Sequence, residues 1–252
     1  EESRPFVVFN TTGSTRSGLV EVVIELERKT FREGLPSKLY HELLAKPKGS
    51  YSVIDEQGNP VAAIISEEEV LFDYELPKDA FRIPFMKRFV KVQVEANQLP
   101  EFSWQTFALV EKAATPVESA PIVSEGGRKL ANAHLEAVIT ENGSLTITDK
   151  ATQKTYRNLL VFEDVGDIAN EYIFKQPEGD QAILSTQFPH HVTIEQNDPL
   201  VGIVRLTQEL QIPVSADDRL LEEQKAVVDF RFRKAQRSQE LVAFKIETEI
   251  RL

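Results

Sequence analysis

The sequence predicts an all-β protein, with a small antiparallel β-sandwich followed by part of a larger β-sandwich. Short runs rich in β-branched and aromatic residues recur along the whole chain. Turn-forming residues separate these runs, and only one short segment has the spacing of a helix. A chain of 252 residues is long enough for two domains that each bury a core.

The first domain is predicted to begin with two strands and a helix. Residues 5–10 and 18–26 are rich in Val, Phe and Ile, and a turn-forming cluster separates them, as expected of strands. Residues 37–45 carry apolar side chains at helical spacing directly after Pro36. We therefore expect one short helix between the strands of this domain.

Four further runs complete the predicted first domain. Residues 50–54 and 61–65 flank a turn around Gly58, which predicts a hairpin. Residues 85–94 alternate apolar and polar side chains near their end, the period of a half-buried strand. Residues 102–110 are a further predicted strand and contain the only Trp of the chain.

A change of composition predicts the domain boundary. Between the runs above and Arg128 the chain becomes rich in Ala, Pro, Ser, Glu and Gly and loses its apolar pattern. We expect a small domain over residues 1–113, a linker over 114–127 and the N-terminal part of a large β-sandwich over 128–252.

The second domain is predicted to consist mainly of strands. Residues 135–139 and 144–149 flank an Asn142-Gly143 pair, a strong hairpin signal. The pattern of strand, loop and strand without long helices then continues. The further predicted strands are residues 158–163, 172–175, 192–195, 201–213, 225–233 and 241–252.

Composition limits the classes of binding partner and the cellular compartment that we expect. The formal net charge of −11 opposes binding to nucleic acids and anionic membranes, because phosphates would meet a repulsive field. No apolar run approaches the roughly 20 residues that span a bilayer, so we expect a soluble protein. The absence of Cys permits a reducing compartment, and we expect a cytoplasmic bacterial protein. The start at Glu1, without Met, predicts a piece of a longer polypeptide.

The sequence lacks the motifs of known catalytic machinery. It has no Gly-x-Ser-x-Gly, no Gly-rich phosphate loop and no His-Glu-x-x-His. His190 and His191 would point to opposite faces of a strand, so they cannot chelate one ion. The acidic runs Glu67–Glu69 and Asp217–Asp218 are interpreted as solvated faces or turns.

One segment carries the polar residue types that are typical of carbohydrate-binding loops. Residues 161–174 predict an apolar strand, a loop and a second apolar strand, and the loop carries carboxylates, Asn170 and Tyr172. Carboxylates and amides form paired hydrogen bonds with sugar hydroxyls, and a Tyr offers a ring face and a hydroxyl. The alternative is an acidic solvated loop with Tyr172 packed beneath it.

This segment, together with residues 142–150, 159–164 and 99–107, resembles the C-terminal β region of glycoside hydrolase family 38, the retaining α-mannosidases. The resemblance implies that the second domain is the front part of a supersandwich similar to that of galactose mutarotase. It also implies an upstream catalytic domain that holds the catalytic carboxylates and zinc or another divalent metal. No catalytic residue and no metal site are then expected in this chain.

The resemblance further implies roles for single residues of the loop. Tyr172 matches a Tyr that contacts substrate mannose in relatives, and Asp167, Asn170 and Glu171 match the remainder of the loop motif. The expected function is therefore a non-catalytic wall of the cleft of an α-mannosidase, with an α-mannoside as substrate of the whole enzyme. In that enzyme, two displacements would proceed through a glycosyl-enzyme intermediate.

Two other functions fit the same pattern. A stand-alone carbohydrate-binding or adhesion module could be built from two sandwiches, and it would lack an upstream catalytic domain. A sugar epimerase on the same supersandwich would need a His facing the cleft, for which His190 or His191 is the nearby candidate.

Overall fold

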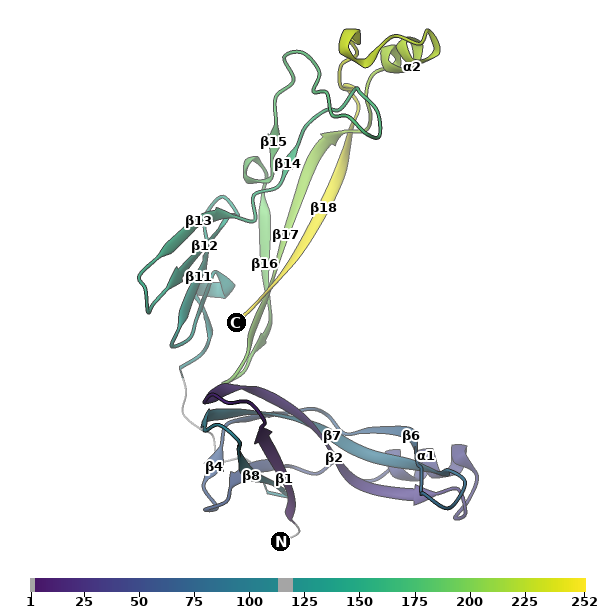
Figure 1. Ribbon diagram of the computed structural model, residues 1–252, viewed down its shortest axis with the longest axis vertical. Coiled ribbons are helices and arrows are strands. Elements are labelled where there is room, and N and C mark those ends of the chain that lie inside the picture. The colour runs from purple at the N-terminus through teal and green to yellow at the C-terminus, as the bar shows by residue number, and fades with distance from the viewer. Residues whose placement is uncertain (1–2, 113–119) are drawn as a thin grey trace. The chain divides into compact units, whose positions relative to one another are not determined.

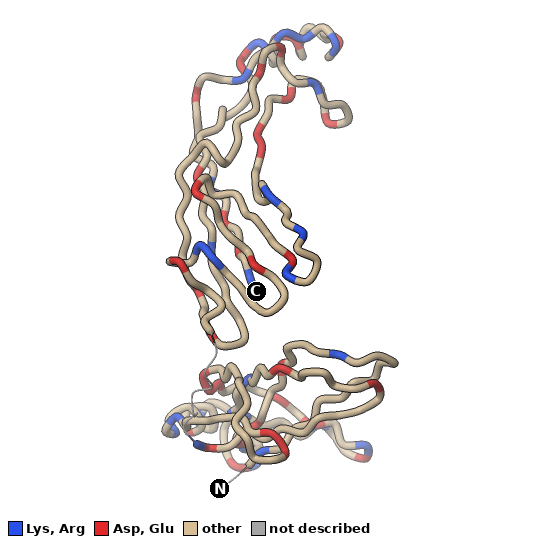
Figure 2. Tube along the Cα trace, turned by 90° about the vertical axis from the view of Figure 1, so that its left-hand side faces the viewer, with Lys and Arg blue, Asp and Glu red and all other residues tan. Residues whose placement is uncertain are grey.

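Figure 1 shows the computed structural model, in which residues 3–112 and 120–252 are described. The chain divides into two compact units. The first contains residues 1–120, and the second comprises Pro121–Asn197 and Val201–Leu252. Acidic and basic residues are interspersed along the trace of both units (Figure 2).

The first unit is a sandwich of two antiparallel sheets with one helix, α1 (Pro36–Leu44). One sheet has the order β1-β8-β3-β4 and consists of β1 (Ser3–Asn10), β8 (Ser103–Val110), β3 (Ser52–Asp55) and β4 (Pro60–Val61). The other sheet is built around the long strand β7 (Ile83–Leu99). This strand pairs with β2 (Arg16–Thr30), β5 (Ala63–Ile65) and β6 (Glu69–Glu75).

The core of the first unit lies between these two sheets. Apolar side chains at alternate positions of β7 and β8 meet there because successive residues of a strand point to opposite faces. The rings of Phe6 and Phe107 stack across β1 and β8, with centroids 5.5 Å apart. The buried members of this core are Ile24, Val53, Val90, Val92, Val94, Phe107 and Leu109.

Most predicted elements of the first unit are confirmed, and two details were wrong. The predicted hairpin of residues 50–54 and 61–65 is short, because only Val53 with Val61 and Ile54 with Pro60 are paired. Residues 63–65 then leave to pair with β7 in the other sheet. Strand β6 was not predicted, and only its first residue, Glu69, belongs to the acidic run that was interpreted as a solvated face or turn.

The run Glu67–Glu69 is only partly solvated, contrary to the prediction. The side chain of Glu68 is 7% exposed and forms an ion pair with Arg88 of β7. Its carboxylate also accepts hydrogen bonds from the Gly49 amide at 2.7 Å and the Tyr51 hydroxyl at 2.9 Å. A buried carboxylate needs such partners, and sequence alone does not reveal them.

The second unit contains two facing antiparallel sheets and a small two-stranded ladder. The first sheet has the order β13-β12-β11-β10-β9, with β9 (Val123–Ser124), β10 (Lys129–Ala131), β11 (Leu135–Ile139), β12 (Leu145–Asp149) and β13 (Thr155–Leu159). The second has the order β16-β17-β18, with β16 (His190–Asn197), β17 (Gly202–Pro213) and β18 (Leu241–Arg251). The ladder pairs β14 (Glu163–Asp164) with β15 (Ile183–Leu184). The prediction of an all-β fold is confirmed.

Short helices complete the second unit. They are η1 (Glu125–Gly127), η2 (Ser185–Gln187), α2 (Asp218–Lys225) and η3 (Phe230–Phe232). The core packs Ile139 and Leu145 of one sheet against Val204 and Leu206 of the other. None of the helices in the described part of the chain is long and apolar enough to cross a membrane.

Four predictions for the second unit need correction. Residues 158–163 do not form one strand, because β13 ends at Leu159 and β14 begins at Glu163. Residues 225–233 do not form the predicted strand, because they contain the end of α2 and the turn η3. Residues 172–175 contribute only an isolated bridge between Asn170 and Ile173. Of the predicted linker, residues 114–119 lie outside the described residues, whereas residues 123–127 form β9 and η1.

Candidate functional site

The candidate carbohydrate loop is the segment 165–182, which connects β14 to β15. Within it the chain makes a tight hairpin. The amide of Ile168 donates to the carbonyl of Lys175 at 2.9 Å, and the amides of Asn170 and Ile173 donate to each other's carbonyls at 3.2 and 3.3 Å. All four residues predicted to bind substrate lie on or beside this hairpin.

Two of the four predicted residues use their side chains to shape the hairpin. Oδ1 of Asp167 accepts from the amides of Ala169 at 2.9 Å and Lys175 at 3.1 Å. Oδ1 of Asn170 accepts from the amides of Tyr172 at 2.9 Å and Ile173 at 3.0 Å, which is an Asx turn. Asp167 and Asn170 therefore stabilise the loop conformation.

The other two predicted residues project from the tip. Tyr172 is 88% exposed, so it is not packed beneath the loop. Glu171 is exposed beside it. Within residues 3–112 and 120–252, neither the Tyr172 hydroxyl nor the Glu171 carboxylate has a hydrogen-bond partner. The tip therefore presents an aromatic face, a hydroxyl and a carboxylate to a ligand.

Two basic side chains, which sequence analysis did not identify, anchor the hairpin to the segment around η3. Nη1 of Arg233 donates to the carbonyl of Ile168 at 2.9 Å and also to that of Ala169. In the opposite direction, Nζ of Lys175 donates to the carbonyls of Phe230, Arg231 and Arg233 at 3.0, 2.9 and 3.0 Å. A side chain of each segment thus donates hydrogen bonds to backbone carbonyls of the other.

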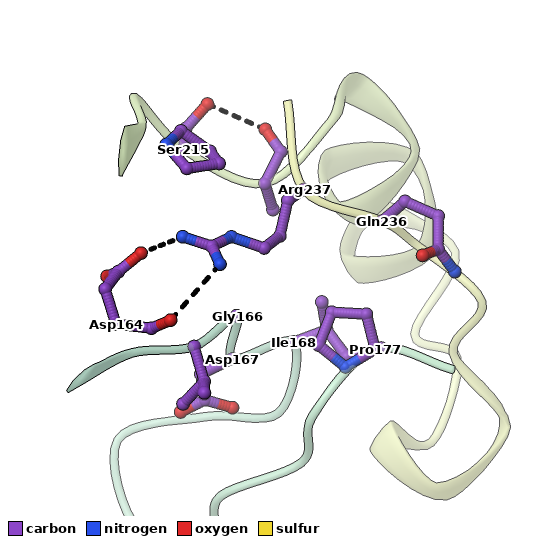
Figure 3. Close-up of a pocket in the computed structure, with 11 residues that line it drawn as sticks. Asp164, Gly166, Asp167, Ile168, Pro177, Ser215, Gln236 and Arg237 are labelled. Carbon is purple, nitrogen blue, oxygen red and sulfur yellow. Dashed lines mark hydrogen bonds and ion pairs between the residues drawn. The ribbon is translucent and has the colours of Figure 1, made fainter. Parts of the chain in front are cut away.

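A third basic side chain, Arg237, anchors the base of the loop (Figure 3). It forms ion pairs with Asp164 and with Asp180, the latter at 3.6 Å. Asp180 in turn accepts from the amide of Gly166 at 2.8 Å. Burial lowers the pKa of the Arg237 guanidinium.

The base of the loop encloses a small polar cavity of about 170 Å³. A side chain at Gly166 would not fit beside it, because a Cβ there would lie 2.8 Å from Pro177 and 2.9 Å from Arg237. The cavity lies between the loop and the segment that connects β17 to β18. Its polar lining comes from Asp164, Asp167, Ser215, Gln236 and Arg237.

Carboxylates fix the segment that carries Arg233 and Arg237. Glu223 of α2 accepts from the amides of Lys234 and Ala235 and from Arg219. Burial raises the pKa of Glu223, but these hydrogen bonds outweigh it and leave the pKa below its usual value. Arg231 donates hydrogen bonds to the Asp229 carboxylate from its side chain and from its backbone amide, and these hold the pKa of Asp229 at about 2.

The two neighbouring histidines lie on opposite faces of β16, as predicted. His191 is exposed, whereas His190 faces Gln208 of β17 and is half-buried. Burial lowers the pKa of His190, with a smaller contribution from the charge of Arg128. Among the described residues there is no group of three or more His, Cys, Asp or Glu that could hold a metal ion.

Comparison with known proteins places this loop in a family context. The model of the glycosyl hydrolases family 38 C-terminal domain 1 matches residues 1–111. The model of the glycosyl hydrolases family 38 C-terminal domain matches residues 130–252, which contain the whole candidate loop.

Two solved structures and one curated protein are similar to the chain. An α-mannosidase from Enterococcus faecalis V583 is 42% identical with a TM-score of 0.82, over 99% of this chain and 28% of that chain. A glycosyl hydrolase family 38 protein from Enterococcus faecalis is 40% identical with a TM-score of 0.80, over 99% of this chain and 29% of that chain. A protein of Halalkalibacterium halodurans, provisionally named mannosylglycerate hydrolase, is 30% identical over 258 residues, 28% of its length.

The chain spans less than a third of the length of these relatives. The two family models together match nearly all of it, and the order of its two units is the order of the two matched domains. The chain belongs to glycosyl hydrolase family 38, of which it carries the C-terminal domains.

Proposed function

We propose that this chain is the non-catalytic β region of a retaining α-mannosidase, and that its loop 165–182 lines part of the substrate cleft. The observation that carries the proposal is the tip of that loop. Tyr172 projects from a hairpin whose backbone is anchored by Arg233 and Lys175, and its hydroxyl is free to bind. A contact group held in place before binding loses less entropy on binding sugar.

The residue types at the tip suit a pyranose. The Tyr172 ring can lie against the apolar face of a sugar, and its hydroxyl can donate or accept one hydrogen bond. The Glu171 carboxylate can accept from two neighbouring hydroxyls. The names of the similar proteins support mannosides as the substrate class of the whole enzyme and favour a glycosidase over an adhesion module.

We assign catalysis and metal binding to polypeptide outside this chain. The described residues offer no cluster of His, Cys, Asp or Glu suited to a divalent cation. When bound in the whole enzyme, zinc or another divalent ion would supply binding and polarisation of sugar hydroxyls. We also propose a cytoplasmic location, which the absence of Cys supports.

The proposal is tested by comparing this chain with the full polypeptide of its gene. We expect the full polypeptide to hydrolyse a nitrophenyl α-mannoside with retention of configuration, and the 252-residue chain to show no turnover with or without zinc. Turnover by the chain that disappears on Tyr172→Ala would contradict the non-catalytic role. A full polypeptide that cleaves no α-mannoside would contradict the enzyme assignment.

A further inference from the structure

The outward face of the sheet β1-β8-β3-β4 in the first unit carries no charged side chain. Strand register defines this face. Phe9 pairs with Trp104, Val7 with Thr106 and Pro5 with Ala108 across β1 and β8. Ala108 also pairs with Ile54, which pairs with Pro60 of β4. We call these residues the uncharged face: Pro5, Val7, Phe9, Ile54, Pro60, Trp104, Thr106 and Ala108.

Large apolar side chains of the uncharged face are open to solvent. Phe9 is 66% exposed and Trp104 is 65% exposed, and their ring centroids lie 6.4 Å apart. Val7, in the next outward position of β1, is also exposed. The inward positions of the same strands are already filled by Phe6, Phe107 and Leu109 in the core. The outward rings are therefore not part of the sandwich core.

Other outward sheet faces of the described chain carry charged side chains, as solvent-facing positions usually do, although Leu19 and Val23 are also exposed on the outward side of β2. The second sheet of the first unit exposes Glu21 and Gln93, which are hydrogen-bonded to each other. In the second unit, outward positions of β17 and β18 pair Arg205 with Glu249 and Glu209 with Lys245. The uncharged face departs from this rule in a chain of which 27% is charged. An exposed contiguous apolar surface of this kind marks an interaction site.

We propose that the uncharged face is the surface onto which the upstream catalytic part of the polypeptide docks, an inference that rests on the proposed function. Edge strand β1 carries three residues of the face and is the first element of the described chain, so polypeptide that precedes β1 would approach this sheet. A tethered domain has a high effective concentration at such a surface. The similar proteins have more than two thirds of their length outside the matched region, which is ample for this partner.

The chemistry of the face fits a protein surface better than a sugar. Its side chains with hydrogen-bonding groups are Thr106 and the indole of Trp104, whereas a sugar site needs several convergent polar groups. Aromatic side chains, especially Trp, are typical centres of protein interfaces.

Hydroxyl-radical footprinting with mass spectrometry of the full polypeptide tests this inference. Oxidation of Phe9 and Trp104 is compared with that of Phe81, which is 96% exposed in a loop of the same unit. After normalisation to the denatured protein, we expect Phe9 and Trp104 to be oxidised several-fold more slowly than Phe81, at every protein concentration. Oxidation as fast as that of Phe81 would overturn the inference, and so would protection that disappears on dilution, because a second copy would then be the occupant.

A variant provides an independent check. Trp104→Glu in the full polypeptide should restore fast oxidation of Phe9, whereas the matched variant Phe81→Glu should leave Phe9 protected. If Trp104→Glu does not fold, the wild-type footprint alone decides. Assays with a nitrophenyl α-mannoside separate the two proposals. If the face is protected but the protein cleaves no α-mannoside, only the proposed function is contradicted. If the face is open in an active α-mannosidase, only the docking surface is contradicted.

Discussion

Arg233 donates a hydrogen bond from Nη1 to the carbonyl oxygen of Ile168 at 2.9 Å, and this contact joins the candidate loop to the segment before β18. The two residues are 65 positions apart in sequence. Lys175 reinforces the same junction from the loop side. The position of the Tyr172 tip thus depends on a part of the chain that would not contact the ligand.

We expect Arg233→Met to loosen the loop without removing any ligand contact. The variant loses charged hydrogen bonds to two carbonyls, so the free energy of unfolding should fall by about 1.5 to 3 kcal/mol. Amide hydrogen exchange of residues 168–175 should accelerate, and KM for an α-mannoside should rise in the full polypeptide. Arg231→Met is the matched control, because the Arg231 side chain contacts exposed Asp229 and the ring of Phe232 but does not reach the candidate loop. Equal effects of both variants would contradict the anchoring role.

Tyr172→Phe should weaken substrate handling through the loss of one hydroxyl. If this hydroxyl binds sugar, kcat/KM of the full polypeptide should fall by about 1 to 3 kcal/mol in transition-state stabilisation, roughly five- to 150-fold. Thermal stability should not change, because the hydroxyl has no partner within the described residues. Tyr156→Phe on β13 is a matched control with another exposed Tyr. An unaltered kcat/KM would mean that the Tyr172 hydroxyl does not bind substrate.

Local patterns in the sequence were sufficient to predict most of the long strands but not the anchors of the site. The alternation within residues 85–94 predicted the middle of β7, because Val90, Val92 and Val94 face the core. The strand predicted for residues 225–233 was wrong, since Glu223 binds the amides of Lys234 and Ala235 and no strand partner is present in the described chain. Arg233 bonds to Ile168 and Glu68 pairs with Arg88, and both contacts join residues that are distant in sequence. No local sequence pattern marks Arg233 or Glu68 as an anchor.

The buried pair of Glu68 and Arg88 should be costly to break and much less costly to replace. Arg88→Met leaves the Glu68 carboxylate buried without its counter-ion, so we expect a loss of about 3 to 5 kcal/mol in the free energy of unfolding. The double variant with Glu68→Met removes both charges and should recover most of this loss. Urea unfolding measures both values. A double variant as unstable as Arg88→Met would show that the packing of the two long side chains, and not the charge, dominates.

Gly143→Ala should destabilise the second unit by more than its backbone angle alone requires. Gly143 has φ of +78°, and a Cβ there would lie 3.1 Å from the His190 ring and 3.2 Å from Gln208. Gly58 has φ of +84° with open space around it, so Gly58→Ala measures the cost of the angle, about 1 to 2 kcal/mol. We expect a clearly larger loss for Gly143→Ala in thermal unfolding. Equal losses would mean that His190 and Gln208 move aside freely.

Alkaline solution should destabilise the first unit through Tyr51. Burial, and then its hydrogen bond to Glu68, raises the pKa of the Tyr51 hydroxyl to about 12. An unfolded Tyr titrates near pH 10, so the folded state binds the proton more tightly. The resulting stability is fully present below about pH 10 and is lost as the pH rises towards about 12. Urea unfolding of wild type and Tyr51→Phe across this range checks the sign. The wild type should lose stability more steeply than the variant, whereas parallel curves would show that Tyr51 does not control the transition.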